Sequence, residues 1–233
     1  MNVMITGASK GIGNALAKKF SEKKRIKLYI ISRTKERLRL LREECLKINP
    51  DAKVYDVSVD LTKQKGQMLL DKIVEEHIDI LINNAGILIN KPFLKLSDDD
   101  IMSMVKMNFL VPVKLITQLF SKIGGSMPTH IVNIGSMGGF QGSVKFPGLS
   151  IYSATKAALA SLTECLAVEF AGKNVFCNCL ALGSVQTEMF TEAFPGYKAS
   201  ISAEEIAEYI TDFSINGYKY HNGKIIPVSL STP

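Results

Sequence analysis

The sequence predicts a single α/β domain spanning 1–233, with a doubly wound, mostly parallel sheet of about seven strands and helices on both faces. Three observations predict this fold. Short apolar runs alternate with segments of helical period along most of the chain. The runs are apolar throughout, as in strands that are covered on both faces. A glycine-rich turn follows the first run.

The first three elements form a β-α-β unit. Residues 2–6 and 27–32 are apolar runs of strand length, and the segment 11–24 between them repeats its apolar residues with helical period. The same alternation continues along the chain. Helices are expected at 34–48, 65–77, 98–123, 150–172 and 202–214, and strands at 52–60, 78–86, 129–136, 174–183 and 224–230.

Two of these helices carry boundary signals. Ser97 stands directly before three aspartates, which is the pattern of an N-cap followed by an acidic first turn. Gly172 stands at the end of the long helical pattern, and glycine readily adopts the left-handed conformation of a C-terminal cap. We therefore expect one helix to begin after Ser97 and another to end at Gly172.

The composition is that of a soluble globular protein with a large apolar interior, because 46% of the residues are hydrophobic and 21% are charged. The first residues lack the basic and apolar regions of a secretory signal. No apolar run reaches the roughly 18 to 20 residues that span a bilayer. We expect a cytoplasmic protein with no membrane partner.

The positive charge is concentrated near the N-terminus. Residues 1–50 contain 13 Lys or Arg against 4 Asp or Glu, and the whole chain has a formal charge of +6. One interpretation is a nucleic-acid-binding surface, but these residues lie mostly on expected helices and lack interleaved aromatic residues. A solvated helix face is the better explanation, so we expect no nucleic-acid partner.

The cysteine pattern indicates neither a disulfide framework nor a metal site. The chain has no C-x-x-C pair and no histidine cluster at zinc-ligand spacing. We expect four reduced thiols that fill apolar space, at Cys45, Cys165, Cys177 and Cys179.

The glycine-rich turn predicts a dinucleotide site. It follows the first expected strand and opens the first helix, where glycines let the backbone approach a diphosphate and the helix N-terminus favours its charge. A merely tight connection is the alternative, and the position inside a β-α-β unit argues against it. The residues expected to bind the cofactor here are Gly7, Ser9, Lys10, Gly11, Ile12 and Gly13.

The end of the second strand favours NADP(H) over NAD(H). No acidic residue stands where a ribose 2′-hydroxyl would be bound; Arg33 follows the strand and could pair with a 2′-phosphate, with Lys10 as a second cation. The alternative is that Arg33 is only a surface residue at the start of a helix.

Tyr152 and Lys156 lie four residues apart in an expected helix, so both side chains share one face. An ammonium group and an oxidised nicotinamide would both favour the tyrosine anion, whose unperturbed pKa is near ~10, and would let the phenol exchange a proton with a substrate oxygen. An interfacial tyrosine beside a snorkelling lysine is the alternative.

Taken together, these residues resemble the short-chain dehydrogenase/reductase family from residue 2 to about Thr187. The resemblance rests on seven pieces in the family's order. These are the turn Gly7-x-x-x-Gly11-x-Gly13, Asp60, Asn83 to Gly86, Asn108, Ser136, Tyr152-x-x-x-Lys156, and the segment "LGSVQTEM".

The resemblance implies a Rossmann-like fold and four catalytic residues. Tyr152 would handle the proton, Lys156 would also hold the nicotinamide ribose, and Ser136 would orient the substrate oxygen. Asn108 matches an asparagine that holds a proton-relay water. The gap from Ser136 to Tyr152 is longer than the family's common spacing, so Ser143 remains an alternative to Ser136.

The resemblance also assigns further cofactor contacts. Asp60 is expected near the adenine, and Tyr152 and Lys156 count among the cofactor-binding residues as well. The others are Leu61, Asn84, Ala85, Gly86, Val185 and Thr187. The sequence departs from the family at Leu182-Gly183, where Pro-Gly is usual, and lacks the usual Gly-Gly near the C-terminus, so cofactor contacts there are expected to differ.

Substrate specificity is expected to lie in two loops, 137–151 and 188–200. Their apolar side chains could line a medium-sized pocket or simply anchor a lid. These side chains are Met137, Phe140, Phe146, Phe190, Phe194 and Tyr197. The helical segments around 109–120 and 157–170 are apolar on more than one face, and the family uses these helices to form homodimers or homotetramers.

The sequence therefore predicts an NAD(P)-dependent oxidoreductase, most simply an NADPH-dependent carbonyl reductase acting on a small carbonyl or alcohol. A non-catalytic protein of the same fold that senses NADPH is the alternative. The presence of Asn108, Ser136, Tyr152 and Lys156 together argues against a sensor, which has no need of proton-handling residues.

Overall fold

The strands form one parallel sheet of seven in the order β3-β2-β1-β4-β5-β6-β9. The computed structural model of the chain describes residues 1–63 and 71–230. The strands are β1 Asn2–Thr6, β2 Lys27–Ser32, β3 Lys53–Ser58, β4 Ile80–Asn83, β5 Thr129–Ile134, β6 Val175–Leu182 and β9 Ile225–Val228. The strand order reverses between β1 and β4, where such sheets open a ligand-binding crevice.

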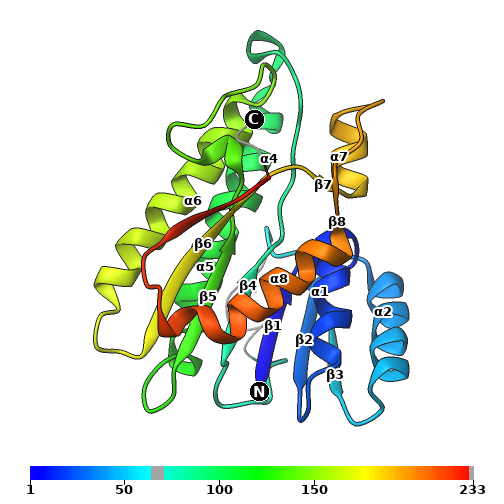
Figure 1. Cartoon of the computed structure of the whole chain (residues 1–233), viewed down its shortest axis with the longest axis vertical. Coiled ribbons are helices and arrows are strands. Elements are labelled where there is room, and N and C mark those ends of the chain that lie inside the picture. Colours follow the sequence, from blue (N-terminus) through cyan, green and yellow to red (C-terminus); the bar gives the residue numbers. More distant parts are fainter. Residues whose placement is uncertain (64–70, 231–233) are drawn as a thin grey trace.

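Helices cover both faces of the sheet, which confirms the predicted doubly wound fold (Figure 1). On one face lie α1 (Gly11–Ser21), α2 (Lys35–Ile48) and α8 (Ala203–Asn216). On the other lie α5 (Val111–Gln118) and α6 (Ser150–Glu169), with α4 (Asp98–Val105) leading towards α5.

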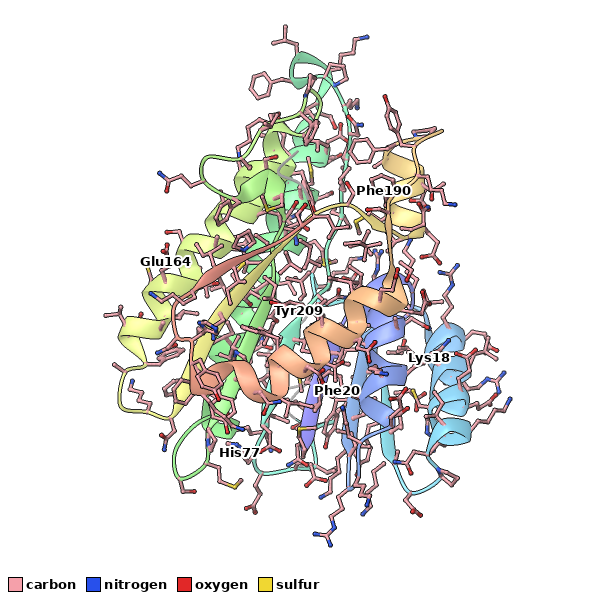
Figure 2. All side chains as sticks on the ribbon, viewed as in Figure 1. Lys18, Phe20, His77, Glu164, Phe190 and Tyr209 are labelled. Atoms are coloured by element: carbon pink, nitrogen blue, oxygen red, sulfur yellow. The ribbon has the colours of Figure 1, made fainter. Side chains whose placement is uncertain are left out.

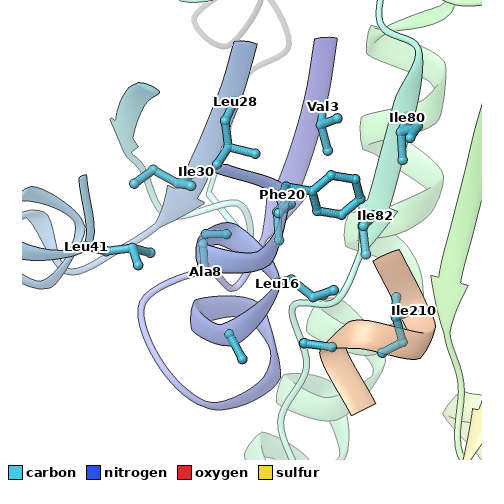
Figure 3. Packing of buried hydrophobic residues seen from close by; sticks show 14 of the residues in the cluster. Val3, Ala8, Leu16, Phe20, Leu28, Ile30, Leu41, Ile80, Ile82 and Ile210 are labelled. Atoms are coloured by element: carbon cyan, nitrogen blue, oxygen red, sulfur yellow. The ribbon is translucent and has the colours of Figure 1, made fainter. Parts of the chain in front are cut away.

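Alternate residues of each strand pack into two separate cores. Val3 and Ile5 of β1 face the α1 side, whereas Met4 faces the α5 and α6 side. Phe20 of α1 is fully buried against the first face, beside Val3 and Ile82 (Figure 3). The continuous apolar runs in the sequence thus reflect strands that are buried on both sides.

The predicted helix at 98–123 is interrupted by a π-helical segment, Lys106–Leu110, between α4 and α5, and a 3-10 turn follows at Phe120–Lys122. The N–H of Val111 bonds to the carbonyl of Lys106, five residues back. Pro112 explains the change of register, because proline has no N–H for the carbonyl four residues earlier and its ring crowds that carbonyl.

Three other expectations differ from the structure. Of the helix expected at 65–77, residues 71–77 are turn and irregular, and 64–70 lie outside the described residues. The helix expected to end at Gly172 ends at Glu169, and Gly172 stands in the following turn with φ +77°. The loop 188–200 contains the short helix α7 (Glu188–Ala193), capped by the Thr187 hydroxyl.

A parallel bridge joins the two ends of this segment. Strand β7 (Val185–Gln186) pairs with β8 (Ile201–Ser202), and Gln186 Oε1 accepts a hydrogen bond of 2.9 Å from the N–H of Ala199. Such two-residue strands have no periodicity that a sequence could reveal.

The helices expected to form subunit contacts leave apolar side chains in solvent, with Phe120 just beyond α5 and Val168 on α6 both exposed. Oligomerisation through them stays a prediction. None of the helices in the described ranges combines the length and hydropathy needed to cross a membrane.

His130 is a buried polar residue of β5 that lies away from the crevice. Its Nδ1 is 2.9 Å from the Ser214 carbonyl and its Nε2 is 3.0 Å from the Asn178 side-chain nitrogen. A carbonyl only accepts and an amide NH₂ only donates, so the ring is neutral with its proton on Nδ1. Burial lowers the pKa of His130 to about 4, although the bond to Ser214 opposes the shift.

His130 should make the protein less stable as the pH falls from about 6.5 to about 4. Within this window the unfolded chain binds a proton that the folded chain does not, so the free energy of unfolding decreases by about 1.4 kcal/mol per pH unit. Above about pH 6.5 the ring is neutral in both states. Urea unfolding across this range should show a flatter slope in His130→Gln than in the wild type. Equal slopes in the two proteins would contradict this contribution of His130.

Candidate active site

A cavity of about 960 Å³ opens at the carboxyl ends of the central strands, where the strand order reverses. The glycine turn, the segment after β4, the end of β5 and the first turns of α6 form its floor. Helix α7 borders it, and Figure 2 shows Phe190 on this helix at the end of the molecule opposite His77. The cavity is therefore where the sequence predicts the cofactor and substrate.

The glycine turn is shaped for close contact with a ligand and with the neighbouring segment. Gly7 and Gly11 have φ of +68° and +53°, in the left-handed region that favours glycine. A Cβ on Gly13 would collide with the Gly7 carbonyl and lie 2.6 Å from Asn84 Nδ2. Gly13 itself does not line the cavity, so its role is packing beneath the turn.

The first turn of α1 has the character of an anion site. Its N-cap residue, Lys10, makes no side-chain hydrogen bond to the N–H groups of that turn, and the turn contains no acidic residue. Within the described residues, no side chain therefore caps these N–H groups. The turn lies beside the cavity, because Ser9, Gly11 and Ile12 line the cavity. A diphosphate fits this arrangement.

Thr6, which the sequence analysis did not single out, joins the glycine turn to the segment after β4. Its hydroxyl oxygen accepts hydrogen bonds from the N–H groups of Asn84 at 3.1 Å and Ala85 at 3.0 Å. Asn84 Nδ2 donates in return to the Thr6 carbonyl at 3.0 Å. Asn84, Ala85 and Gly86 thus line the cavity beside the turn, as their expected cofactor role requires.

One end of the cavity is basic. Lys10 and Arg33 line it as expected, and Arg37 joins them from one helical turn further along the chain. The sequence analysis missed Arg37, although its i+4 spacing from Arg33 was a usable signal. Arg37 makes no ion pair within the described ranges, and Lys10 lies 4.0 Å from Glu192.

The neighbouring Leu61 lines the cavity, whereas Asp60 does not. Asp60 instead bonds within its own loop. Its carboxylate accepts hydrogen bonds from the hydroxyl of Thr62 at 2.6 Å and from the Thr62 N–H at 3.0 Å. These bonds hold the pKa of Asp60 below its usual value, and the nearby Arg33 adds to the effect. Asp60 therefore holds the loop that carries Leu61.

Tyr152 and Lys156 project from the first turns of α6 into the cavity. Lys156 is 5% exposed, its Nζ donates a 2.7 Å hydrogen bond to the carbonyl of Ile134, and Nζ lies 5.9 Å from the centre of the Tyr152 ring. Burial lowers the pKa of Lys156 to about 8, so the ammonium form still predominates at neutral pH. Burial also raises the pKa of Tyr152, and the Ser136 hydroxyl opposes this shift.

The structure separates the two candidate serines. Ser136 lines the cavity at the end of β5 and interacts with the Tyr152 phenol. Ser143 is buried in the loop and does not line the cavity; its single hydroxyl hydrogen is shared between the carbonyls of Met137 at 2.5 Å and Phe140 at 2.9 Å. The residues between Ser136 and Tyr152 thus form a loop that is held by its own hydrogen bonds. Ser136 is the serine that lies beside the tyrosine.

Asn108 lies in the π-helical segment, behind the cavity wall. Its Oδ1 accepts from the N–H of Ile87 at 2.8 Å, and its Nδ2 donates to the Ile87 carbonyl at 2.9 Å and to the Thr155 hydroxyl at 3.1 Å. The side chain therefore braces the segment after β4 against α6. A π-helical turn at this position is typical of functional sites.

The other end of the cavity is apolar and aromatic. Phe190 and Phe194 line it, with their ring centres 5.2 Å apart and their ring planes tilted by 39°. Met137, Phe146 and Tyr197 line it as well, whereas Phe140 does not. Among the described lining residues the charged ones are Lys10, Arg33, Arg37, Lys156 and Glu188. Glu188 stands on α7 together with Phe190, so the wall that carries the aromatic residues also carries one acidic side chain.

The segment after β6 closes the remaining side. Val185 and Thr187 line the cavity, and a Cβ on Gly11 would lie 3.2 Å from Thr187 Cγ2. Leu182 and Gly183, where the sequence departs from the family pattern, also line it. The described residues include no cluster of three His, Cys, Asp or Glu suited to a metal ion, and all four cysteines are free thiols.

Comparison with known proteins identifies the family. The sequence profile of the short-chain dehydrogenases matches residues 1–198. The chain belongs to the short-chain dehydrogenases. A 3-oxoacyl-[acyl-carrier-protein] reductase of Aquifex aeolicus is 32% identical over 97% of this chain and 94% of its own length. A putative steroid dehydrogenase of Caenorhabditis elegans is 31% identical over 80% of this chain and 60% of its own.

Solved short-chain dehydrogenases share the fold at lower identity. Levodione reductase superimposes with a TM-score of 0.85 at 23% identity, covering 98% of this chain and 95% of its own. A Burkholderia cenocepacia short-chain dehydrogenase in complex with NADP has a TM-score of 0.84 at 23% identity, covering 97% and 95%. These solved structures establish the shared Rossmann-like fold, whereas the family match establishes an oxidoreductase.

The packing of Gly13 predicts that Gly13→Ala weakens cofactor binding. The added methyl group must push the Gly7 carbonyl or Asn84 aside, which deforms the phosphate-binding turn. A loss of at least about tenfold in NADPH affinity, or about 1.4 kcal/mol, is expected in a fluorescence titration. The control Gly172→Ala strains a turn with φ +77° but lies outside the cavity and has nothing within 4 Å of the added methyl group, so it should lower stability and retain wild-type NADPH affinity. Equal affinities for the two variants would contradict this role of Gly13.

Proposed function

We propose that this protein is an NADPH-dependent carbonyl reductase whose substrate is uncharged and apolar around its carbonyl group. One observation carries the proposal: a tyrosine with a raised pKa, beside a buried ammonium, lines a single cavity that has a basic end and an aromatic end. The basic end suits a phosphorylated dinucleotide, and the aromatic end suits an apolar ketone.

The cofactor would supply the hydride in such a reaction. The glycine turn and the N–H groups of α1 would hold its diphosphate, and Arg33 and Lys10, with Arg37, would face its 2′-phosphate. Asn84 to Gly86, Val185 and Thr187 would pack along it. This assignment is supported by the NADP complex of the Burkholderia relative. A Brucella melitensis 3-ketoacyl-(acyl-carrier-protein) reductase of the same fold was instead solved with NADH. It has a TM-score of 0.83 at 22% identity, covering 97% of this chain and 96% of its own.

The protein's own residues would then manage the carbonyl oxygen. Burial keeps the Tyr152 phenol protonated at neutral pH, which is the state that can donate a proton to an oxygen as negative charge develops on it. Ser136, beside the phenol, would donate a second hydrogen bond that orients this oxygen. Lys156 would favour the phenolate left after proton transfer, because its ammonium is charged and buried nearby.

NADPH oxidation measured against a panel of carbonyl compounds tests the proposal. The panel should include simple ketones, β-keto acyl thioesters, quinones and pterins, each class with neutral and anionic members. The apolar aromatic side chains, with the carboxylate of Glu188 on the same helix, predict that neutral apolar members are reduced with higher kcat/KM than anionic ones of the same size. Absence of turnover with the whole panel, or preference for anionic members throughout, would contradict the proposal.

Replacement of Tyr152 tests the proton donor. Tyr152→Phe removes the hydroxyl while keeping the ring, so kcat should fall by at least about 10²-fold, within the usual contribution of general acid catalysis. NADPH affinity, followed by fluorescence titration, should stay near that of the wild type. Tyr209→Phe on α8, outside the cavity, is the matched control and should retain full turnover. Unchanged turnover in Tyr152→Phe would refute the assignment.

Replacement of Arg33 tests the preference for NADPH. A charge-assisted hydrogen bond contributes about 1.5–3 kcal/mol, so Arg33→Ala should raise the KM for NADPH by roughly tenfold or more and leave the KM for NADH nearly unchanged. Arg37→Ala should act in the same direction. Arg39→Ala is the control, because Arg39 pairs with Glu36 and Glu43 and does not line the cavity. Comparable KM values for NADPH and NADH in the wild type would remove this claim.

A further inference from the structure

Thr155 is a buried hydroxyl of α6 that none of the roles above uses. It is 5% exposed and directly precedes Lys156, but it does not line the cavity. Its side chain lies against the π-helical segment, where it accepts the hydrogen bond from Asn108 Nδ2. A hydroxyl in this place therefore joins two segments that are 47 residues apart in the chain.

The hydrogen bonds of Asn108 and Thr155 leave little freedom in this contact. Both N–H groups of the Asn108 amide are used, one by the Ile87 carbonyl and one by the Thr155 oxygen, and Asn108 Oδ1 is held by the N–H of Ile87. Thr155 then donates its only hydrogen to the main-chain carbonyl of Tyr152 at 2.7 Å.

Helical threonines commonly donate to a carbonyl three or four residues back, so the bond to Tyr152 alone would be ordinary. The distinctive feature is the second bond, which makes the same hydroxyl an acceptor for Asn108. A continuous path of hydrogen bonds thus runs from Ile87, in the segment that lines the cavity, through Asn108 and Thr155 to the backbone of Tyr152.

We propose that Thr155 is a positioning residue that sets the first turn of α6, and with it the Tyr152 phenol, relative to Asn108 and the segment after β4. The inference rests on the proposed role of Tyr152 as the proton donor. Because this brace ties the backbone of Tyr152 to the cavity floor, loss of the hydroxyl should displace the phenol from Lys156 and Ser136. Small displacements of a reacting group lower turnover far more than they lower binding.

Thr163 offers a matched control on the same helix. It is fully buried two turns further on, accepts a 2.9 Å hydrogen bond from Asn133 Nδ2 and donates a 2.8 Å bond to the Leu159 carbonyl. The two threonines therefore make the same kinds of bond in the same helix, but Thr163 touches no residue of the cavity wall through these bonds. A purely structural contribution of the hydroxyl should be similar at both positions.

The experiment compares Thr155→Val, Thr155→Ser and Thr163→Val in the full chain. Valine keeps the size of threonine and leaves the amide and carbonyl partners without the hydroxyl, whereas serine restores it. With the most active ketone of the panel, Thr155→Val should lower kcat by about tenfold or more with NADPH affinity unchanged. Thr155→Ser should recover most of the lost turnover, and Thr163→Val should lower Tm to a similar extent as Thr155→Val but keep its kcat.

A second measurement reports on the phenol without requiring turnover. The ionisation of Tyr152 in the presence of NADP⁺ can be followed from the ultraviolet absorbance of tyrosinate, after subtraction of the Tyr152→Phe titration. Thr155→Val should raise the apparent pKa of this group relative to wild type, because the phenolate lies further from the Lys156 ammonium. Thr155→Ser and Thr163→Val should titrate like the wild type.

The outcomes separate this inference from the proposed function. If Thr155→Val and Thr163→Val show the same kcat and the same tyrosine titration, Thr155 has only a structural role and the inference fails, whatever Tyr152 does. If Tyr152→Phe keeps full turnover, the proposed function fails first. If no carbonyl compound is turned over, the tyrosine titration alone decides whether Thr155 positions the phenol.

Discussion

The hydrogen bond from Lys156 to the Ile134 carbonyl is the contact on which the arrangement of the site depends. It holds a charged group in the interior at the end of β5, and this costs free energy unless the group is bonded. Gly139, in the 3-10 turn Met137–Gly139 after β5, lets α6 pack closely against that turn, since a Cβ there would lie 2.6 Å from the N atom of Ala157.

The same close approach sets the electrostatics of the cavity. At the end of the sheet a buried ammonium faces a half-buried tyrosine, and burial moves their pKa values in opposite directions, down for Lys156 and up for Tyr152. The two pKa values therefore move apart: the ordinary pKa of tyrosine lies slightly below that of lysine, whereas in this site the pKa of Tyr152 lies above that of Lys156. The phenol thus stays protonated at neutral pH beside a charged ammonium, and this is the protonation state that a proton donor requires.

The sequence was sufficient to predict the sheet, its strands and the location of the site. Apolar runs and helical periodicity report burial directly, and the glycine turn and the Tyr152 and Lys156 pair are local patterns. Features that depend on contacts between distant segments were not predicted. The Thr6 and Thr155 hydroxyls act through partners 78 and 47 residues away, and nothing in their neighbouring residues signals this. The π-helical turn had a local signal in Pro112, but its combination with Asn108 becomes apparent only in three dimensions.

The bridge between β7 and β8 fixes the two ends of the segment that contains α7. It joins Val185 to Ile201 and Gln186 to Ser202, so the segment between them leaves the body and returns to it at adjacent points. The backbone of the bridge holds its two ends. Gln186 Oε1 accepts a bond from the N–H of Ala199, and Gln186 Nε2 donates a 3.0 Å bond to the Thr191 hydroxyl of α7. A redesign of α7 that keeps the bridge and a hydroxyl at position 191 should therefore change the cavity wall while the sheet keeps its place.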